Sequence, residues 1–438
     1  MAITDDVLVI GGGLAGTTAA LAAAERGVQV RLLTYKQSTL RHASGLIDVL
    51  GYAPNGQGPL ADPFDALESL PEGHPYERVG SDSIREALLF FDAIVGDAYA
   101  GEHTDANALV PTSSGAIKPT ARYPTGVASG LASDPRETLL VGFETLPEFD
   151  APLAAAHLEE TGAPFEARGV TLSFPGIRRD DAKVTRYAHL LDRDETVDVG
   201  RGETSARAAL AAIVRDRLES ESRVGFPPIL GDDNHATVRR DLEERLGVDV
   251  FEVPSGPPSL PGMRLEDHLY DALEDAGVRV TTGVPVVDYQ VDERSADGVG
   301  DSSSARIEHV LVDRKGRDVP YRADEYVLAT GGLVGKGVRS ERERVFEPIF
   351  DCHVEAPPDR YDWFDGDAFG DHPFARFGVS VDRELRPLDA VGDLEFANLQ
   401  AAGGVLSGYD FAAEKSGSGV SLATGFVAGD RAGSEVRG

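Results

Sequence analysis

A glycine-rich turn between an apolar run and an alanine-rich segment constrains the fold of this chain more than any other feature. The apolar run is Val7–Ile10, the Gly-x-Gly-x-x-Gly turn covers residues 11–16, and a helix over about 14–26 leads to a second strand at 28–33. In such a unit the first glycine permits a tight turn, the second lets a phosphate approach the backbone, and the third lets helix and strand pack closely. Free N–H groups at the start of the helix also favour an anion. The pattern predicts a Rossmann-like unit that binds a nucleotide or a flavin.

The residue that ends the second strand departs from the usual form of this unit. A carboxylate normally stands there, roughly 20 residues after the glycine turn, and it holds the hydroxyls of the adenosine ribose. Here the position is Thr34, followed by Tyr35 and Lys36. A threonine hydroxyl can form a hydrogen bond but cannot supply a charge-assisted pair of acceptors. This favours a phosphate ligand without an adenosine half, such as FMN, whereas weaker binding of FAD is the alternative that these residues leave open.

The charge of the chain indicates the medium in which it works. Of its 438 residues 74 are Asp or Glu and 42 are Lys or Arg, of which only six are Lys, and the net charge is −32. Such a surface suits concentrated salt, where self-repulsion is screened within a few ångströms. We expect a salt-adapted source, such as a haloarchaeon. No basic stripe is visible, so nucleic-acid binding is not expected.

Cysteine and metal-binding residues narrow the chemistry further. Cys352 is the only cysteine, which excludes an internal disulfide and a cysteine-ligated iron–sulfur cluster on this chain. No His or carboxylate cluster has the spacing of metal ligands, so no metal site is expected. Residues 7–24 form an uncharged stretch, but it is rich in Gly, Thr and Ala, and we expect no direct membrane insertion.

Two later segments repeat the combination of strand and small-residue turn. Residues 324–332 read as a strand that runs into Ala-Thr-Gly-Gly, and 396–404 as a strand that ends in Gly-Gly. A Gly-rich segment, 417–425, then begins a C-terminal helix. Small residues allow the backbone to pass close to a cofactor, so we expect both turns and this helix start to line the flavin site.

Between these segments the pattern changes to alternating strands and helices. Expected strands lie at 139–143 and 248–253, and expected helices at 151–161, 203–218 and 236–246. Three more strands, at 284–289, 306–313 and 317–322, suggest a small β unit. The predicted fold class is therefore α/β: a Rossmann-like flavin domain of the FAD/NAD(P)-binding type with an inserted α/β domain and a small β unit.

This alternation gives a division into domains. We expect the first part of the flavin domain at 1–90, the inserted domain at 91–259, and the second part of the flavin domain with the small β unit at 260–438. Prolines at 254, 257, 258 and 261 mark the crossing back.

Several short motifs together resemble one family. The glycine turn is followed by Gln37-Ser38, Ser44-Gly45 and Asp48-Val49-Leu50, and later by Pro257-Pro258-Ser259 and Gly262-Met263-Arg264-Leu265. With the Ala-Thr-Gly-Gly turn and the Gly-rich C-terminal segment, the chain resembles the B subunit of anaerobic glycerol-3-phosphate dehydrogenase over essentially its whole length. Arg41-His42 departs from the less charged pair expected there.

The resemblance implies a function, a cofactor and partners. The complex of this family oxidises sn-glycerol 3-phosphate to dihydroxyacetone phosphate and passes the electrons to the quinone pool. In that family the A subunit carries FAD, the B subunit is the FMN-binding member, and a cysteine-rich C subunit holds iron–sulfur clusters and docks the complex on the inner face of the cell membrane. The missing carboxylate at Thr34 and the single cysteine agree with this picture. A non-catalytic electron-transfer subunit, or a stand-alone FAD-dependent oxidoreductase of another small acid, are the alternatives.

The chemistry of alcohol oxidation suggests site residues. It needs a base near the hydroxyl and, for a phosphorylated substrate, a cation; the candidates are His42 and Arg264. The expected cofactor-binding residues are Gly11, Gly12, Gly13, Ala15, Gly16, Thr34, Ser38, Ser44, Gly45, Gly331, Gly332, Gly403, Gly404, Gly419 and Val420.

Overall fold

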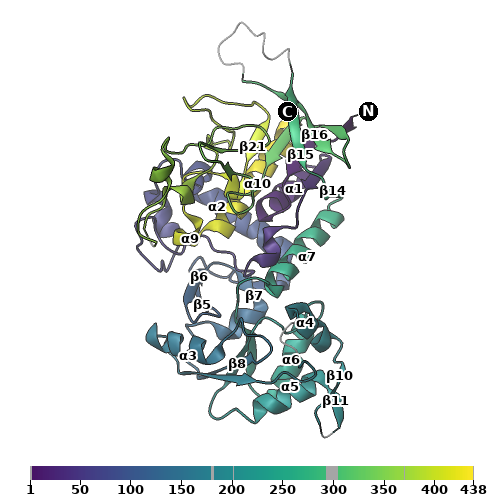
Figure 1. Cartoon of the computed structure of the whole chain (residues 1–438), viewed down its shortest axis with the longest axis vertical. Coiled ribbons are helices and arrows are strands. Elements are labelled where there is room, and N and C mark those ends of the chain that lie inside the picture. The colour runs from purple at the N-terminus through teal and green to yellow at the C-terminus, as the bar shows by residue number, and fades with distance from the viewer. Residues whose placement is uncertain (1, 179–181, 201, 293–303, 369, 438) are drawn as a thin grey trace. The chain divides into compact units, whose positions relative to one another are not determined.

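The computed structural model describes residues 2–178, 182–200, 202–292, 304–368 and 370–437. They form two compact units (Figure 1). Unit 1 comprises Met1–Thr39, Asp48–Val95 and His268–Gly438, and unit 2 comprises Leu40–Ile47 and Gly96–Asp267.

The unit bounds differ from the predicted domains at three places. Residues 91–95, which the sequence assigned to the inserted domain, belong to unit 1. Residues 40–47 and 260–267, which the sequence assigned to the flavin domain, belong to unit 2. The first of these segments is tied to unit 2 by the backbone, because Ile47 N–H donates to the carbonyl oxygen of Arg122 over 2.8 Å. An ion pair of 2.9 Å between Arg41 and Glu266 joins the two segments to each other. Neither bond has a signature in local sequence.

The main sheet of unit 1 has five strands in the order β14-β3-β2-β18-β21, and every neighbouring pair is parallel. The strands are β2 (Val7–Ile10), β3 (Val30–Thr34), β14 (Arg279–Thr282), β18 (Glu325–Leu328) and β21 (Leu399–Ala401). Ile10 pairs with Leu33 on one side and with Leu328 on the other. The carboxyl ends of the central strands therefore meet at one edge, which is where open α/β sheets bind ligands.

Two glycine- and alanine-rich helices pack against each other in unit 1. They are α1 (Leu14–Glu25) and α10 (Gly417–Glu435), drawn side by side in purple and yellow in Figure 1. A Cβ on Gly425 would lie 2.4 Å from the carbonyl oxygen of Ala15, and one on Gly429 would lie 2.1 Å from that of Ala19. The small residues thus bring the two backbones into direct contact. Helix α2 (Pro75–Val95) also packs against α10.

The small β unit is the second sheet of unit 1, in the order β1-β17-β16-β15. Its strands are β1 (Ile3–Thr4), β15 (Val286–Val291), β16 (Ile307–Asp313) and β17 (Asp318–Arg322). The last three confirm the strands predicted from sequence, with boundary shifts of a few residues. Helix α7 (Leu260–Asp275) precedes β14.

Unit 2 has its own parallel sheet, in the order β13-β12-β8-β9. The strands are β8 (Thr138–Phe143), β9 (Ala167–Leu172), β12 (Arg223–Phe226) and β13 (Asp249–Glu252), and the helices are α3 (Ala151–Glu160), α4 (Val184–Asp192), α5 (Ala206–Arg215) and α6 (His235–Leu246). A buried apolar cluster that includes Leu139, Leu210 and Val224 joins the sheet to these helices. The helix predicted at 203–218 begins later, because β11 (Glu203–Ser205) pairs with β10 (Thr196–Asp198). Ser205 then caps α5 by accepting from Ala208 N–H.

The remaining elements are short. They are β4 (Tyr99–Ala100), β5 (Ala108–Pro111), β6 (Ile117–Thr120), β7 (Tyr123–Pro124), β10 (Thr196–Asp198), β11 (Glu203–Ser205), β19 (Arg339–Ser340), β20 (Val345–Phe346), α9 (Phe411–Glu414) and 3-10 turns such as η1 (Thr39–His42). Among the described residues, no helix combines the length and apolarity needed to cross a bilayer. Nor do these residues contain a cluster of three or more His, Cys, Asp or Glu side chains placed to hold a metal ion.

Candidate cofactor site

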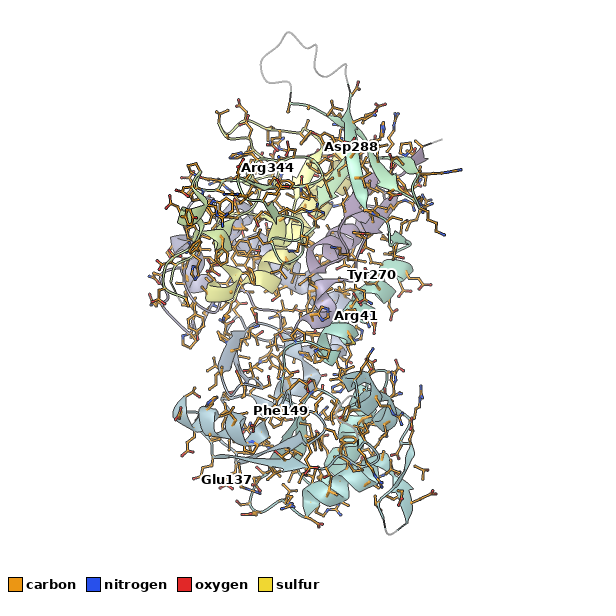
Figure 2. All side chains as sticks on the ribbon, in the orientation of Figure 1. Arg41, Glu137, Phe149, Tyr270, Asp288 and Arg344 are labelled. Carbon is orange, nitrogen blue, oxygen red and sulfur yellow. The ribbon has the colours of Figure 1, made fainter. Side chains whose placement is uncertain are left out.

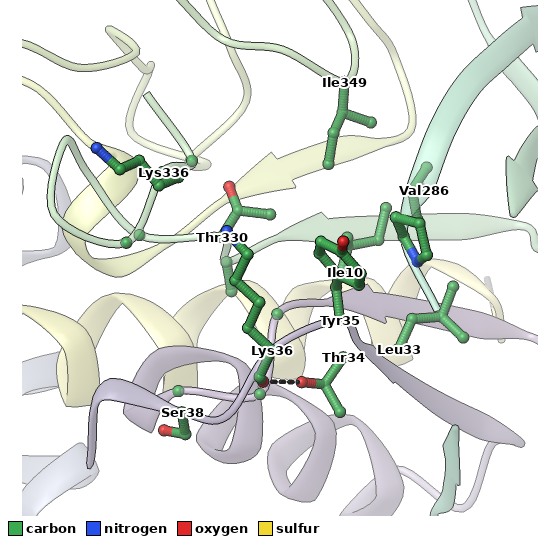
Figure 3. A pocket seen from close by; sticks show the side chains of 18 of the residues that line it. Ile10, Leu33, Thr34, Tyr35, Lys36, Ser38, Val286, Thr330, Lys336 and Ile349 are labelled. Atoms are coloured by element: carbon green, nitrogen blue, oxygen red, sulfur yellow. Dashed lines mark hydrogen bonds between the residues drawn. The ribbon is translucent and has the colours of Figure 1, made fainter. Parts of the chain in front are cut away.

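A pocket of about 490 Å³ opens in unit 1 at the carboxyl ends of β2, β3 and β18 (Figure 3). The glycine turn after β2 forms one wall and residues 34–39 after β3 form another. Residues 284–287, after β14, and 329–337, after β18, complete most of the lining. Four parallel strands thus deliver their following loops to one cavity, as the sheet order requires.

The glycines of the first turn have two separate roles. Gly11 has φ +121°, and a Cβ there would lie 2.1 Å from the carbonyl oxygen of Ala329. A Cβ on Gly16 would lie 1.8 Å from the carbonyl oxygen of Gly11. The packing of the chain itself therefore demands glycine at positions 11 and 16.

Gly13 is different, because nothing in the chain demands a glycine there. Its φ of −83° and ψ of −173° suit any residue, and no atom lies within 4 Å of the position that a Cβ would take. Gly13 lines the pocket and directly precedes α1. The bare backbone at this point is a cradle that a side chain would fill, so the residues present fit a phosphate group held at the start of the helix.

Tyr270, labelled in Figure 2 on the part of α7 that belongs to unit 1, contacts the glycine turn. Its hydroxyl lies 3.5 Å from the carbonyl oxygen of Gly12, and a Cβ on Gly12 would lie 2.7 Å from that hydroxyl. The tyrosine therefore restricts Gly12 and holds the loop in place. Sequence reasoning missed this residue, since nothing local connects α7 with the glycine turn.

The charge of the pocket is opposite to that of the chain. None of the described residues that line it is Asp or Glu, although 74 of the 438 residues of the chain are acidic. Lys36, Lys336 and Arg339 line it instead, so two of the six lysines of the chain are at this site. In Figure 3 the side chain of Lys36 extends from the loop after β3 into the pocket. This lining favours an anionic ligand.

Thr34 is buried and its hydroxyl already has a partner. The hydroxyl donates to the carbonyl oxygen of Lys36 over 3.0 Å, as the dashed line in Figure 3 marks. A ribose hydroxyl at this place would find only the lone pairs of Thr34 and no carboxylate among the described lining residues.

The structure brings six of the predicted cofactor residues into the pocket lining. These are Gly11, Gly12, Gly13, Thr34, Ser38 and Gly331. Ala15 and Gly16 are buried in α1 behind the turn. Gly332 lies against Gly404, since a Cβ on Gly332 would be 2.5 Å from the carbonyl oxygen of Gly404.

The other predicted cofactor residues do not line this pocket, and their role stays a prediction. Gly403 N–H donates to the Thr424 hydroxyl over 2.9 Å. At the start of α10, Gly419 N–H donates to the carbonyl oxygen of Asp48 over 2.8 Å, and Val420 is fully buried. Ser44 and Gly45 belong to unit 2. The amide of Gly419, which the sequence assigned to the flavin, is thus bound within the protein.

The two catalytic candidates both lie in unit 2. Arg264 forms an ion pair of 2.7 Å with Glu252 and donates to the carbonyl oxygen of Gly231. Burial raises the pKa of Glu252, but the charges of Arg264 and His235 outweigh it and hold that pKa below its ordinary value. Arg264 therefore links the end of β13 to the loop that contains Gly231. His42 is exposed at the end of η1. No observation tests a catalytic role for either residue.

Sequence reasoning also missed several lining residues that lie beyond the motifs. The glycine pattern after β18 continues as Gly331, Gly335 and Gly337, with Lys336 inside it, and all four line the pocket. That repeat, around one of the few lysines, was a usable signal. Residues 284–287 carried no such signal, because their place depends on the pairing of β14 with β3.

Comparison with known proteins places the chain in a family. The model of the FAD binding domain family matches residues 6–420. The chain is 60% identical over 432 residues to the B subunit of the probable anaerobic glycerol-3-phosphate dehydrogenase of Halobacterium salinarum, covering 99% of this chain and 98% of that protein. It is 31% identical to the B subunit of the anaerobic glycerol-3-phosphate dehydrogenase of Vibrio cholerae, covering 97% of this chain and 95% of that protein. A 3-ketosteroid Δ1-dehydrogenase from Sterolibacterium denitrificans aligns over 99% of this chain and 100% of its own, with a TM-score of 0.44 and 11% identity. This chain is a flavin-binding oxidoreductase of the FAD binding domain family, and within it belongs to the family of the B subunit of anaerobic glycerol-3-phosphate dehydrogenase.

Proposed function

We propose that this chain is the B subunit of a complex that oxidises sn-glycerol 3-phosphate to dihydroxyacetone phosphate with a flavin. The substrate is proposed from the 60% identity, over nearly the whole of both chains, to the B subunit of the probable anaerobic glycerol-3-phosphate dehydrogenase of Halobacterium salinarum. The flavin is supported independently by the bare backbone at Gly13 and by the cationic lining of the pocket.

The residues of unit 1 define how the flavin would be held. The flavin supplies the acceptor for the two electrons of the alcohol. The backbone at Gly12 and Gly13 would hold its phosphate at the start of α1, and Lys36 would balance the phosphate charge. Ser38, on the same loop, lines the pocket and places a hydroxyl group for the polar chain of the flavin.

We propose FMN as this flavin. The structure strengthens the argument from Thr34, because no described lining residue is acidic and the Thr34 hydroxyl already donates to its own loop. A ribose diol therefore has no charged acceptor among the described residues of the pocket. FAD is the second candidate. It is favoured by the family model, which is that of an FAD binding domain.

The family also supports partners for this chain. Its relatives are named as one subunit of a larger enzyme. We propose a catalytic partner that bears FAD and an iron–sulfur partner, which carries electrons to the quinone pool and docks the complex on the inner face of the cell membrane. The single cysteine, Cys352, is buried, so cysteine-ligated clusters must reside on another chain.

Anaerobic mixing with substrate tests the function. The purified chain with its flavin, in concentrated salt, is mixed with sn-glycerol 3-phosphate while the visible band of oxidised flavin is followed. Bleaching of the isolated chain supports direct oxidation. Bleaching only after the FAD-bearing partner is added supports an electron-transfer role. No bleaching in the assembled complex overturns the proposal and favours a stand-alone oxidoreductase of another small acid.

A further inference from the structure

Unit 2 contains a second pocket, of about 300 Å³, that the cofactor site does not use. Three segments that are distant in sequence line it: 42–46, 112–118 and 254–256. Five of the ten lining residues are Ser or Thr, and His42 and Lys118 are also among them. The pocket is thus rich in groups that donate hydrogen bonds.

The local charge again opposes that of the chain. No described residue of this lining is acidic, although acidic residues outnumber basic ones by 74 to 42 in the sequence. Lys118 is one of only six lysines. The carboxylate of Glu266, near His42, is paired with Arg41 at 2.9 Å. An anion would therefore meet attraction here and repulsion over most of the remaining surface.

Backbone hydrogen bonds hold the walls of the pocket in place. Ser113 N–H donates to the carbonyl oxygen of Pro254 over 3.0 Å, which joins two of the three segments. Within the turn between β5 and β6, the Thr112 hydroxyl donates to the carbonyl oxygen of Ala116 over 3.0 Å and lies 3.2 Å from the Ser114 hydroxyl. A site that is already formed loses little entropy when a ligand binds.

The donor set identifies the class of ligand. A lysine ammonium has three donors, and each serine hydroxyl can donate to an oxygen, whereas the Thr112 hydroxyl already donates to Ala116. A phosphate monoester offers several charged acceptor oxygens and matches this set. We propose that the pocket binds the phosphate group of a small phosphate ester, which, if the function proposed above holds, is sn-glycerol 3-phosphate.

Substitution of Lys118 in the assembled complex tests this site. Lys118→Gln should raise the KM for sn-glycerol 3-phosphate and the inhibition constant of inorganic phosphate by roughly ten- to a hundredfold, with little change in kcat, because a charge-assisted contact to the phosphate is lost. Ser113→Ala should have the same effect to a smaller extent. Lys315→Gln, at an exposed lysine of unit 1, is the matched control and should change neither constant.

Direct binding of radiolabelled inorganic phosphate to the full chain separates this proposal from the function. If the complex does not oxidise glycerol 3-phosphate but wild-type chain binds phosphate and Lys118→Gln does not, the function fails and the phosphate site stands. If oxidation proceeds and Lys118→Gln and Ser113→Ala both keep the wild-type KM and phosphate binding, the site is overturned and the function stands. Thermal unfolding of each variant checks that it is folded.

Discussion

At the residue scale, the three glycines of the turn after β2, Gly11, Gly13 and Gly16, are needed for different reasons. A side chain on Gly11 or Gly16 would collide with backbone oxygens, whereas one on Gly13 would meet no atom of the chain. The sequence predicted all three from their spacing alone. The motif also assigned a packing role to Gly11 and Gly16 and a ligand role to Gly13, but it could not name the atoms that exclude a side chain, the carbonyl oxygens of Ala329 and Gly11.

Gly13→Ala should leave the fold intact and weaken flavin binding by about tenfold or more, because the added methyl group displaces the phosphate from the backbone. The measurement is the ratio of bound flavin to chain after dialysis, with circular dichroism as the check on folding. Gly366→Ala is the control, since its Cβ also meets no atom, it has no positive φ and it does not line the pocket. Gly16→Ala should instead lower the yield of folded protein. Normal flavin content in Gly13→Ala would refute the assigned role of the cradle.

Glu325, at the start of β18, should make stability depend on pH. Its burial, with a smaller effect of the Glu435 charge, raises its pKa from 4.5 to about 7, although Arg306 pairs with it at 3.1 Å. A carboxyl group with a raised pKa in the folded state stabilises the fold most below its unfolded pKa. That contribution is lost as the pH rises from about 4.5 to about 7.

Relative to wild type, Glu325→Gln should therefore gain stability across that pH window, by an amount on the order of 3 kcal/mol. Melting temperatures of the two proteins at several pH values between about 4.5 and 8 give the comparison. Other buried carboxyl groups, such as Glu347, titrate in both proteins, so their effect cancels when the two melting temperatures are subtracted at each pH. A difference in melting temperature that stays constant with pH would contradict the account.

At the element scale, the contact of α1 with α10 shows what could be predicted from the sequence and what could not. The sequence predicted each helix from its composition. It assigned the start of α10, residues 417–425, to the cofactor, whereas Gly425, Gly429 and Gly433 of this helix are required by its packing against α1 and the residue after it. Glycine and alanine at helical spacing indicate that either a ligand or another helix packs closely against the helix. A single sequence does not show which of the two it is. The five-strand order, which places residues 284–287 in the pocket, was likewise not predictable because it depends on long-range pairing.

Gly429→Val should destabilise unit 1 by roughly 2–3 kcal/mol, because its side chain would meet the backbone oxygen of Ala19 and force the helices apart. Thermal unfolding in concentrated salt measures the loss. Ser434→Val places the same side chain at an exposed position of α10 and should cost little. Equal melting temperatures for the two variants would show that the close contact is unimportant.

At the scale of the whole molecule, the sequence predicted the fold class and much of the inserted α/β domain. Those predictions rest on patterns that repeat over many residues. The assignment of residues 40–47 to the flavin domain was wrong, because the segment is held in unit 2 by bonds such as that of Ile47 to Arg122. His42, the predicted base, and Ser44, a predicted cofactor residue, both line the second pocket, in unit 2.

The net charge of −32 predicts that stability depends on salt. Lowering KCl from about 1 M to about 0.1 M lengthens the screening distance from about 3 Å to about 10 Å, so repulsion among carboxylates increases. The melting temperature should fall by an amount on the order of 10 °C. A melting temperature that is independent of salt would show that the acidic surface has another purpose.

The identity of the cofactor tests the central claim most directly. Wild-type chain is purified in concentrated salt and denatured, and the released flavin is quantified and identified by its mass. The account predicts one FMN per chain. Release of FAD would keep the flavin site but overturn the argument from Thr34, whereas a folded chain that carries no flavin, and takes up neither FMN nor FAD, would contradict the account.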